Sequence, residues 1–308
     1  MGTDQLAAIN NKDLAGLSTD KINALSAEQF NAFTAAQVKT LTVGQVSNLD
    51  DEIIQGLGSE EIEAFTAAQL KALTITQMGK FSAEQIAMFS TASDNNQIAS
   101  LSAAQIGALS GDQVAGFTDT QVGKFSAAQV AGLTATQAPS LTTAQVGAMT
   151  DKQIAAITNA AFAKLSTDVI AGLSTAVKDG DKLSQVQALT AGQIAELDEG
   201  QIQALTAGED GQIAAFAPKQ IAAFSSTQLN KMSTEQIGSI TAAQIALMTF
   251  TGETGQINNL SADLVAGLSA AQVTALSDKQ VASLSTTQLA AMGTDQLAAI
   301  NNKDLAGL

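Results

Sequence analysis

An eight-residue unit runs through almost the whole chain and limits its possible folds more than any other feature. Written in eights from Met1, the chain opens with MGTDQLAA, INNKDLAG, LSTDKINA and LSAEQFNA. Position 1 is nearly always Leu, Phe, Met or Ile, position 2 is usually Ser or Thr, position 5 is usually Gln, and position 6 is usually aliphatic. Self-similarity at a fixed short period predicts a repeat architecture and not an ordinary globular domain.

The unit fits neither a strand nor one continuous helix. Positions 1 and 6 would face opposite sides of a strand, and along a continuous helix the apolar stripe would wander around the axis. A short capped helix fits every position, because Ser/Thr-x-x-Gln is the capping-box pattern and its flanking apolar residues form a hydrophobic staple. In the unit at 25–32, Ser26 would cap the helix, Gln29 would close the box, and Leu25 would staple to Phe30.

So short a helix is unstable alone, because nucleation costs more than its few hydrogen bonds return. Neighbouring units must therefore hold it, with positions 1 and 6 inward, small residues at position 8 allowing close packing, and positions 3, 4 and 7 facing water. The sequence predicts an all-α fold: a superhelical α-solenoid of very short capped helices, one per octad. Phe81, Phe89, Phe117 and Phe125 occupy position 1 and are predicted core residues.

Three units carry extra residues, all between the Ser/Thr and the Gln, at 89–100, 205–215 and 248–259. Insertion at one fixed place predicts loops on one side of a stack. A fourth irregularity, Lys178 to Lys182, keeps the eight-residue register but breaks the motif. Pro218 falls at the first helical position, which suits proline, whereas Pro139 at position 7 should mark a local break. The spacing of the irregular units suggests about five octads per superhelical turn.

Residues 1–17 recur identically as residues 292–308. We interpret the chain, 1–308, as a single continuous octad-repeat solenoid in which 1–291 is one higher-order repeat and 292–308 begins the next. An engineered or circularly closed protein is the alternative explanation of this recurrence.

The loop sequences are the candidate contact sites. They are rich in Gly, Asp and Asn, whose clustered oxygens could bind Ca²⁺, a cation that prefers such ligands. Ordinary surface loops are the simpler interpretation. The acidic run of Asp50, Asp51, Glu52, Glu60 and Glu61 is expected to form a solvated face. The candidate loop residues are Ser93, Asp94, Asn95, Asn96, Asp179, Gly180, Asp181, Glu209, Asp210, Gly211, Gly252 and Glu253.

The two polar columns allow further interpretations. The Gln column could form a ladder of side-chain hydrogen bonds between turns, although the capping box explains it more locally. The Ser/Thr column could form a flat hydroxyl array, as on ice-binding solenoids, but capping would occupy those hydroxyls.

Composition argues against several classes of function. The chain has no Cys, no His and no Arg, so the usual catalytic bases and thiol nucleophiles are missing and we expect no enzyme. Its formal net charge of −15 argues against nucleic-acid binding. No apolar run reaches the length of a membrane helix, and the first residues do not read as a secretory signal.

Octads such as LSAAQIGALSGDQVAGF at 101–117 and LSAAQVTALSDKQVASL at 268–284 resemble the Leu-Thr-x-x-Gln-Val-x-Ala arrays of giant bacterial surface or secreted proteins. The resemblance covers nearly the whole chain, implies an extracellular, extended role and transfers no functional residue. We therefore expect a structural protein, a solenoid segment of an extracellular bacterial fibre, sheath or stalk that self-associates or occurs in tandem. The alternative is a cell-surface adhesin whose insertion loops bind a ligand, with or without Ca²⁺.

Overall fold

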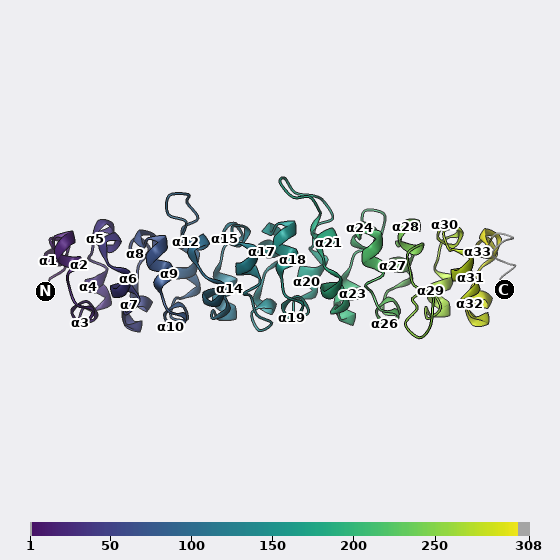
Figure 1. Ribbon diagram of the computed structural model, residues 1–308, viewed down its shortest axis with the longest axis horizontal. Coiled ribbons are helices and arrows are strands. Elements are labelled where there is room, and N and C mark those ends of the chain that lie inside the picture. Colours follow the sequence, from purple (N-terminus) through teal and green to yellow (C-terminus); the bar gives the residue numbers. More distant parts are fainter. Residues whose placement is uncertain (1, 301–308) are drawn as a thin grey trace. The chain divides into compact units, whose positions relative to one another are not determined.

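The computed structural model describes residues 2–300, and within them the regular structure consists of short helices of four to six residues and one 3₁₀ turn (Figure 1). The described residues form no strand, only an isolated antiparallel bridge between Val177 and Ser184. The predicted all-α architecture of short helices is confirmed. In units without insertions, each α-helix begins just after position 2, which is usually Ser or Thr, and ends before the next apolar position 1. Capping and the following extended residue limit its length.

The helices of the first half of the chain are α1 Thr3–Ala7, α2 Asn11–Ala15, α3 Thr19–Asn23, α4 Ala27–Phe30, α5 Ala35–Thr40, α6 Val43–Val46, α7 Asp51–Gly56, α8 Ser59–Ala64, α9 Ala67–Ala72, α10 Ile75–Met78, α11 Ala83–Ala87, α12 Gln97–Ser100, α13 Ala103–Gly107, α14 Gly111–Gly116, α15 Asp119–Gly123, α16 Ala127–Val130, the 3₁₀ turn η1 Ala138–Ser140, and α17 Thr143–Ala148. Those of the second half are α18 Asp151–Ala156, α19 Asn159–Phe162, α20 Thr167–Ala171, α21 Gln185–Ala188, α22 Ala191–Ala195, α23 Glu199–Ala204, α24 Gln212–Ala215, α25 Pro218–Ile221, α26 Ser226–Leu229, α27 Thr234–Gly238, α28 Ala242–Ile245, α29 Ala262–Ala266, α30 Ala270–Thr274, α31 Asp278–Ala282, α32 Thr286–Ala291 and α33 Thr294–Ala299.

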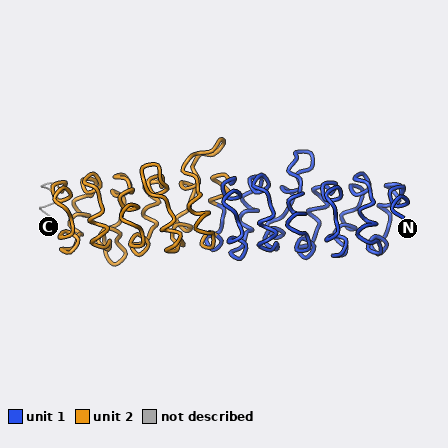
Figure 2. Tube along the Cα trace, turned by 180° about the vertical axis from the view of Figure 1, so that it is seen from behind, with its two compact units in different colours: residues 1–149, 156–161 blue, residues 150–155, 162–308 orange. Residues whose placement is uncertain are grey.

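The chain divides into two compact units, residues 1–149 with 156–161, and residues 150–155 with 162–308 (Figure 2). Within each, a helix packs on the third helix after it along the chain. In the first unit α2 packs on α5 and α5 on α8, and in the second α20 packs on α23 and α30 on α33. Each unit is thus a solenoid in which contacts are made between successive turns.

One turn holds fewer octads than the irregular units suggested. The side chain of Gln37 donates hydrogen bonds to carbonyl groups 28 and 31 residues earlier, on Ile9 and Leu6. Separations of 28 and 31 residues are three and a half to just under four octads, so the expectation of about five octads per turn is wrong. Irregular units are tolerated at several places around the turn, and their spacing therefore does not report its length.

Positions 1 and 6 form the core, as predicted. Every position-6 residue from Leu6 to Val281 except Lys178 is buried, and so is every position-1 residue from Phe33 to Ile300 except Asp181. The Phe residues predicted to be internal are among them, and Phe81 packs edge-on against Phe89 at 5.3 Å between ring centroids. Phe117 and Phe125 pair in the same way at 5.1 Å. Edge-to-face pairs of this kind add to the burial of apolar area.

Small residues at position 8 let successive turns approach closely. A Cβ atom at Gly132 would lie 2.5 Å from the carbonyl oxygen of Ala103, three octads earlier, and one at Gly116 would lie 2.6 Å from the carbonyl oxygen of Ala83. Neither position could carry a side chain without a shift of backbone. Ala103 and Ala83, at position 3 and expected to face water, are therefore partly covered by position 8 of the next turn, whereas Val43 and Ile75 at the same position are exposed.

The two prolines behave as their positions predict. Pro218 begins α25, and Pro139 lies in η1, where a 3₁₀ turn replaces the α-helix of the other units. The preceding Gln137 keeps its hydrogen bonds to Thr134, Ile106 and Leu109, so the local break leaves the stack intact.

Candidate functional site

The recurring polar element of the fold is the capping box built from positions 2 and 5. In the unit at 25–32, the Ser26 hydroxyl oxygen accepts from the N–H of Gln29 at 3.2 Å, and the Gln29 Oε1 accepts from the N–H of Ser26 at 2.9 Å. Phe30 is fully buried and Leu25 is half-buried at the positions of the staple. The same pair of bonds recurs in other helices, among them α5, α14 and α32, and each pair satisfies two otherwise unpaired helix N–H groups.

The same Gln also bonds the preceding turn. Gln37 accepts from the N–H of Thr34 at 2.7 Å through Oε1, while its Nε2 donates to the carbonyl oxygens of Leu6 and Ile9, both at 2.9 Å. The Leu6 carbonyl belongs to the end of α1, where helix carbonyls lack an i+4 partner, and the Ile9 carbonyl lies in the link between α1 and α2. One side chain therefore completes the start of one helix and the end of another.

These bonds repeat along both compact units of the chain and make a ladder of Gln side chains. Gln113 bonds Met78 and Phe81, Gln145 bonds Val114 and Phe117, and Gln244 bonds Ile213 and Phe216. Each of these amides is at least 95 % buried with its acceptor and both donor hydrogens used. Capping and laddering were alternatives when only the sequence was considered, yet the amide performs both because it has an acceptor and two donors on separate atoms.

Three Asn residues at position 7, Asn23, Asn31 and Asn230, donate to a carbonyl of the following turn, whereas the ladder Gln donates to the preceding one. We call this contact an inverted rung; the sequence reasoning missed it. Asn23 donates to the carbonyl oxygen of Asn48 at 2.7 Å and accepts from the N–H of Asp50 at 3.2 Å, so it supplies the cap acceptor for α7 from the turn before. Helix α7 has Ile53 where Gln would stand. Asn230 does the same for Ser261 in α29, which has Leu264 in place of Gln.

The third inverted rung meets the one buried carboxyl group of the ladder. Asn31 donates to the carbonyl oxygen of Gly56 at 2.6 Å, while Glu61 takes the place of Gln in α8. Glu61 is 4 % exposed, so the expectation that it lies on a solvated face is wrong, because position 5 faces the preceding turn. Burial raises the pKa of Glu61, repulsion from Glu60 adds to this, and hydrogen bonds from the N–H groups of Glu61 and Gly58 oppose it. Since Gly58 bonds Glu61, the Oδ1 of Asn31 is left buried without a hydrogen-bond partner.

All insertions close in the same way, by a hydrogen bond from the cap N–H to the Oε1 of the displaced Gln. Ser90 bonds Gln97 at 2.7 Å, Thr206 bonds Gln212 at 3.1 Å, and Thr249 bonds Gln256 at 2.9 Å. In an uninterrupted stretch, a ladder Gln donates to a carbonyl 28 residues earlier, as Gln69 does to Leu41. Where the bond spans the four extra residues at 89–100, the separation is 32 residues, as from Gln105 to Leu73. The extra residues therefore leave the stack in register.

The irregularity at Lys178 to Lys182 is a fourth insertion of this kind. Ser174 donates to Oε1 of Gln185, eleven residues later, where an ordinary unit spans three. The insertion is thus eight residues long. Because this equals one octad, the sequence register survives although a whole unit has left the stack, and this is why the sequence alone suggested only a broken motif. The hairpin projects from the helices between α20 and α21 (Figure 1).

Three of the residues proposed as loop ligands, Asn95, Asn96 and Asp181, make hydrogen bonds to backbone groups. Asn95 accepts from the N–H of Ala67 and donates to the carbonyl oxygens of Glu63 and Phe65, and Asn96 caps α12. Asp181 accepts from the N–H of Asp151, whose own carboxylate accepts from the N–H of Lys182. That bond, with others from backbone N–H groups, lowers the pKa of Asp151.

The remaining candidates lie on the loop surfaces. Ser93, Asp94, Asp179, Glu209, Asp210 and Glu253 are exposed, and Gly211 is buried. Gly180, Gly208 and Gly252 are the glycines with positive φ among residues 2–300, at 85°, 97° and 68°, and all three turn an insertion. Over the same residues, no three acidic side chains are grouped closely enough to hold a metal ion.

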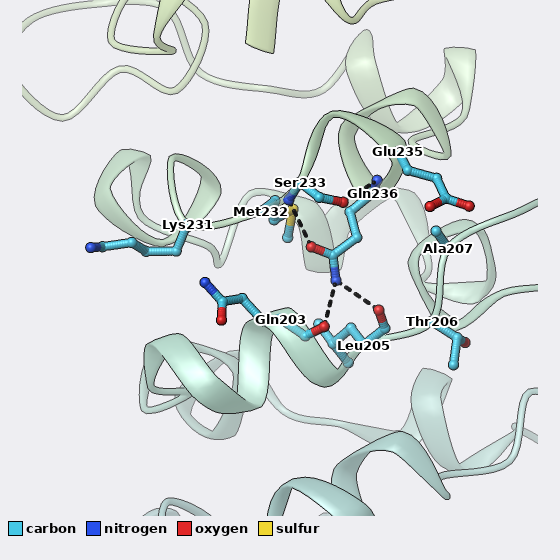
Figure 3. A pocket seen from close by; sticks show the side chains of 9 residues that line it. All are labelled: Gln203, Leu205, Thr206, Ala207, Lys231, Met232, Ser233, Glu235 and Gln236. Atoms are coloured by element: carbon cyan, nitrogen blue, oxygen red, sulfur yellow. Dashed lines mark hydrogen bonds between the residues drawn. The ribbon is translucent and has the colours of Figure 1, made fainter. Parts of the chain in front are cut away.

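The cavities of the described residues are grooves between turns. One of about 500 Å³ is lined by Gln203, Leu205, Lys231, Ser233 and Gln236 among others (Figure 3). Its floor is a ladder rung, since Gln236 accepts from Ser233 and donates to Leu205 and Gln203. A second, of about 320 Å³, lies under the first insertion and brings together Lys39, Glu63 and Asp94.

Within the part of the chain that the structure describes, none of the helices is both long enough and apolar enough to span a membrane.

Comparison with known families identifies two segments of the chain. A family model described as the ALTTAQ repeat matches residues 6–43 and 212–249. The six letters of that name correspond to positions 8, 1, 2, 3, 4 and 5 of the octad, and residues 140–145 read SLTTAQ. No curated protein matches the chain. The repeating hydrogen-bond pattern and the two matched segments together show that this is a repeat protein, similar to the ALTTAQ repeat at residues 6–43 and 212–249.

Proposed function

We propose that the protein is structural, a solenoid segment of an extracellular bacterial fibre, sheath or stalk built from tandem or end-to-end copies. The observation that carries this proposal is the Gln ladder, as in Gln145, which bonds both Val114 and Phe117 of the previous turn. The Gln that recurs at position 5 bonds one turn of the solenoid to the preceding turn. Such a stack can be extended by adding units, because every unit contacts only its neighbours.

The surface supports the same proposal. The net charge of −15 keeps separate arrays apart in solution, since like-charged surfaces repel. The extracellular location rests on the resemblance of the octads to arrays of giant bacterial surface proteins. No residue is proposed as catalytic, cofactor-binding or metal-binding, and the only contacts proposed are those between copies.

Electron microscopy of the native material tests the proposal. We expect filaments or stalks of uniform width whose axial repeat matches the length of one 291-residue block. Isolated particles of one chain each, at the concentrations at which the protein occurs, would contradict it. Antibody labelling of intact cells checks the location, and labelling that requires cell lysis would contradict an extracellular role.

A second candidate function, a cell-surface adhesin, is favoured by the loops. Four insertions of three to eight residues enter at one point of the unit without disturbing the ladder, which is how a scaffold displays variable contact residues. The cavity beside Asp94, Lys39 and Glu63 would be the first place to look for a ligand. Melting with and without a chelator separates the two functions if Ca²⁺ is involved: a large loss of stability favours the adhesin and no change favours the passive structural element.

A further inference from the structure

The two ends of the described stack expose different halves of the same core. In the first turn, the position-1 residues Ile9, Leu17 and Leu25 are half-buried, whereas position-1 residues from Phe33 onward are buried. In the last turn the opposite holds. Leu289 is half-buried and Leu297 is 44 % exposed, although both occupy position 6, where every residue from Leu6 to Val281 except Lys178 is buried. The face of the first turn therefore exposes part of its position-1 side chains, and the face of the last turn exposes part of its position-6 side chains.

The chain itself shows how these two faces fit. Residues 292–300 have the same sequence as residues 1–9. In the later copy, Gln296 donates to the carbonyl oxygens of Val265 at 3.0 Å and Leu268 at 2.6 Å and is 7 % exposed. Ile300 is 5 % exposed there, while the identical Ile9 of the first segment is half-buried.

The first segment is folded to make the same contacts. Gly2 donates to Oε1 of Gln5 at 2.9 Å, and Gly293 donates to Oε1 of Gln296 at 2.8 Å, so both amides are held by the same capping box. Gln5 is nevertheless exposed. A preorganised amide beside half-buried apolar side chains needs only a turn of matching carbonyls to complete the rung.

We propose that residues 1–32 are a docking surface for the last turn, residues 260–291, of another copy of this 291-residue block. In the joined pair, residues 1–9 of one block make the contacts that residues 292–300 make here, so the ladder and the core run on without a break. This inference rests on the proposed function and names its partner, a second copy of the chain. A contact of one face with a different face propagates in one direction and builds filaments.

The test uses a polypeptide of two blocks, residues 1–291 joined directly to residues 1–308. The chain has no Cys, so Leu25→Cys can be placed as the single thiol in either block. The same residue then serves as its own control. We expect a thiol reagent to modify the first-block Cys readily and the second-block Cys at least about tenfold more slowly, because reaction there requires the covering turn to open.

Leu57→Cys calibrates the assay, since Leu57 is a position-1 residue that is 5 % exposed in the single chain. Leu17→Cys provides a second probe if Leu25→Cys fails to fold. Equal labelling rates of the introduced thiol in the two blocks would overturn the inference, provided that the circular dichroism spectrum of the variant matches that of the parent. That result is distinct from a failure of the proposed function, because native filaments could still form through other surfaces, and blocks could join without ever forming an extracellular fibre.

Discussion

The side-chain nitrogen of Gln37 lies 2.9 Å from the carbonyl oxygen of Leu6, on the neighbouring turn of the solenoid. The same Gln accepts a hydrogen bond from the backbone of Thr34, at the start of its own helix. A local capping motif is thereby also the tertiary contact of the fold. Formation of each helix and stacking of each turn are coupled through one side chain, which explains how helices of four to six residues persist.

Replacing a ladder Gln should cost more than replacing its cap. In Gln145→Ala, the carbonyls of Val114 and Phe117 and the N–H of Thr142 all lose their partner, so we expect a loss of about 2–4 kcal/mol. Thr142→Ala removes only the hydroxyl cap and should cost about 1 kcal/mol. Hydrogen exchange of the flanking helices measures both, because repeat arrays need not unfold in two states. Equal effects of the two substitutions would refute the ladder's role.

The inverted rung should be exchangeable for an ordinary one. Asn23→Ala should destabilise the chain by about 1–3 kcal/mol, because it leaves the N–H of Asp50 and the carbonyl of Asn48 without this partner. Adding Ile53→Gln restores an acceptor at the usual position, so the double variant should be more stable than the sum of the single changes predicts. A double-mutant cycle measures this coupling. Additive effects would show that Asn23 does not stand in for the missing Gln.

Glu61→Gln should stabilise the protein, and more so as pH rises. The folded-state pKa of Glu61 lies above its ordinary value of 4.5, so folding favours the neutral form. Stability is therefore unpenalised below that value and falls as pH rises through the raised pKa, when a charged carboxylate must stay buried. We expect the difference in Tm between variant and parent to be small near pH 4 and to widen towards neutral pH.

Glu84→Gln is the control of opposite sign. Glu84 is exposed, and hydrogen bonds from its own N–H and from Ser82 lower its pKa, so its charged form favours folding. Its contribution is present above the ordinary value of 4.5 and is lost as pH falls through the lowered pKa. The Tm of this variant should therefore approach that of the parent in acid. If the Tm of Glu61→Gln differed from that of the parent by the same amount at every pH, the argument that Glu61 is penalised by burial would be contradicted.

Two Gly-to-Ala changes should have opposite signs. At Gly132 the new Cβ would lie 2.5 Å from the carbonyl oxygen of Ala103, so the turns must separate and we expect a loss of about 1–3 kcal/mol. At Gly44 in α6, the nearest atom lies 3.9 Å away, and Ala should stabilise by about 0.5–1 kcal/mol through its better helix propensity. Thermal unfolding of both variants is the measurement. A neutral Gly132→Ala would mean that turns are not closely packed at position 8.

Deleting residues 91–94 should convert the first insertion into a regular octad, with Ser90 three residues before the ladder Gln. We expect an unchanged helical circular dichroism spectrum and a stability change within about 1 kcal/mol, because loop closure depends weakly on loop length. If the adhesin function holds, ligand binding is lost while the fold remains. Unfolding on deletion would show instead that the loop is part of the scaffold.

The sequence alone determined the local structure. Ser26 with Gln29 predicts a capping box, and the apolar residues at positions 1 and 6 predict two buried columns, because these depend on neighbours within one octad. The positions of Pro139 and Pro218 predicted their effects for the same reason.

Only the tertiary structure decided which octads meet. The length of a turn depends on the angle between successive helices, which no single octad encodes, so the expectation of five octads failed where the bond of Gln37 to Ile9 shows three and a half. The inverted rung of Asn23 and the eight-residue insertion before Gln185 were hidden likewise, since each pairs residues that are distant in sequence. An amide has hydrogen-bonding capacity left after it caps its helix, and only the stacking of turns shows where that capacity is used.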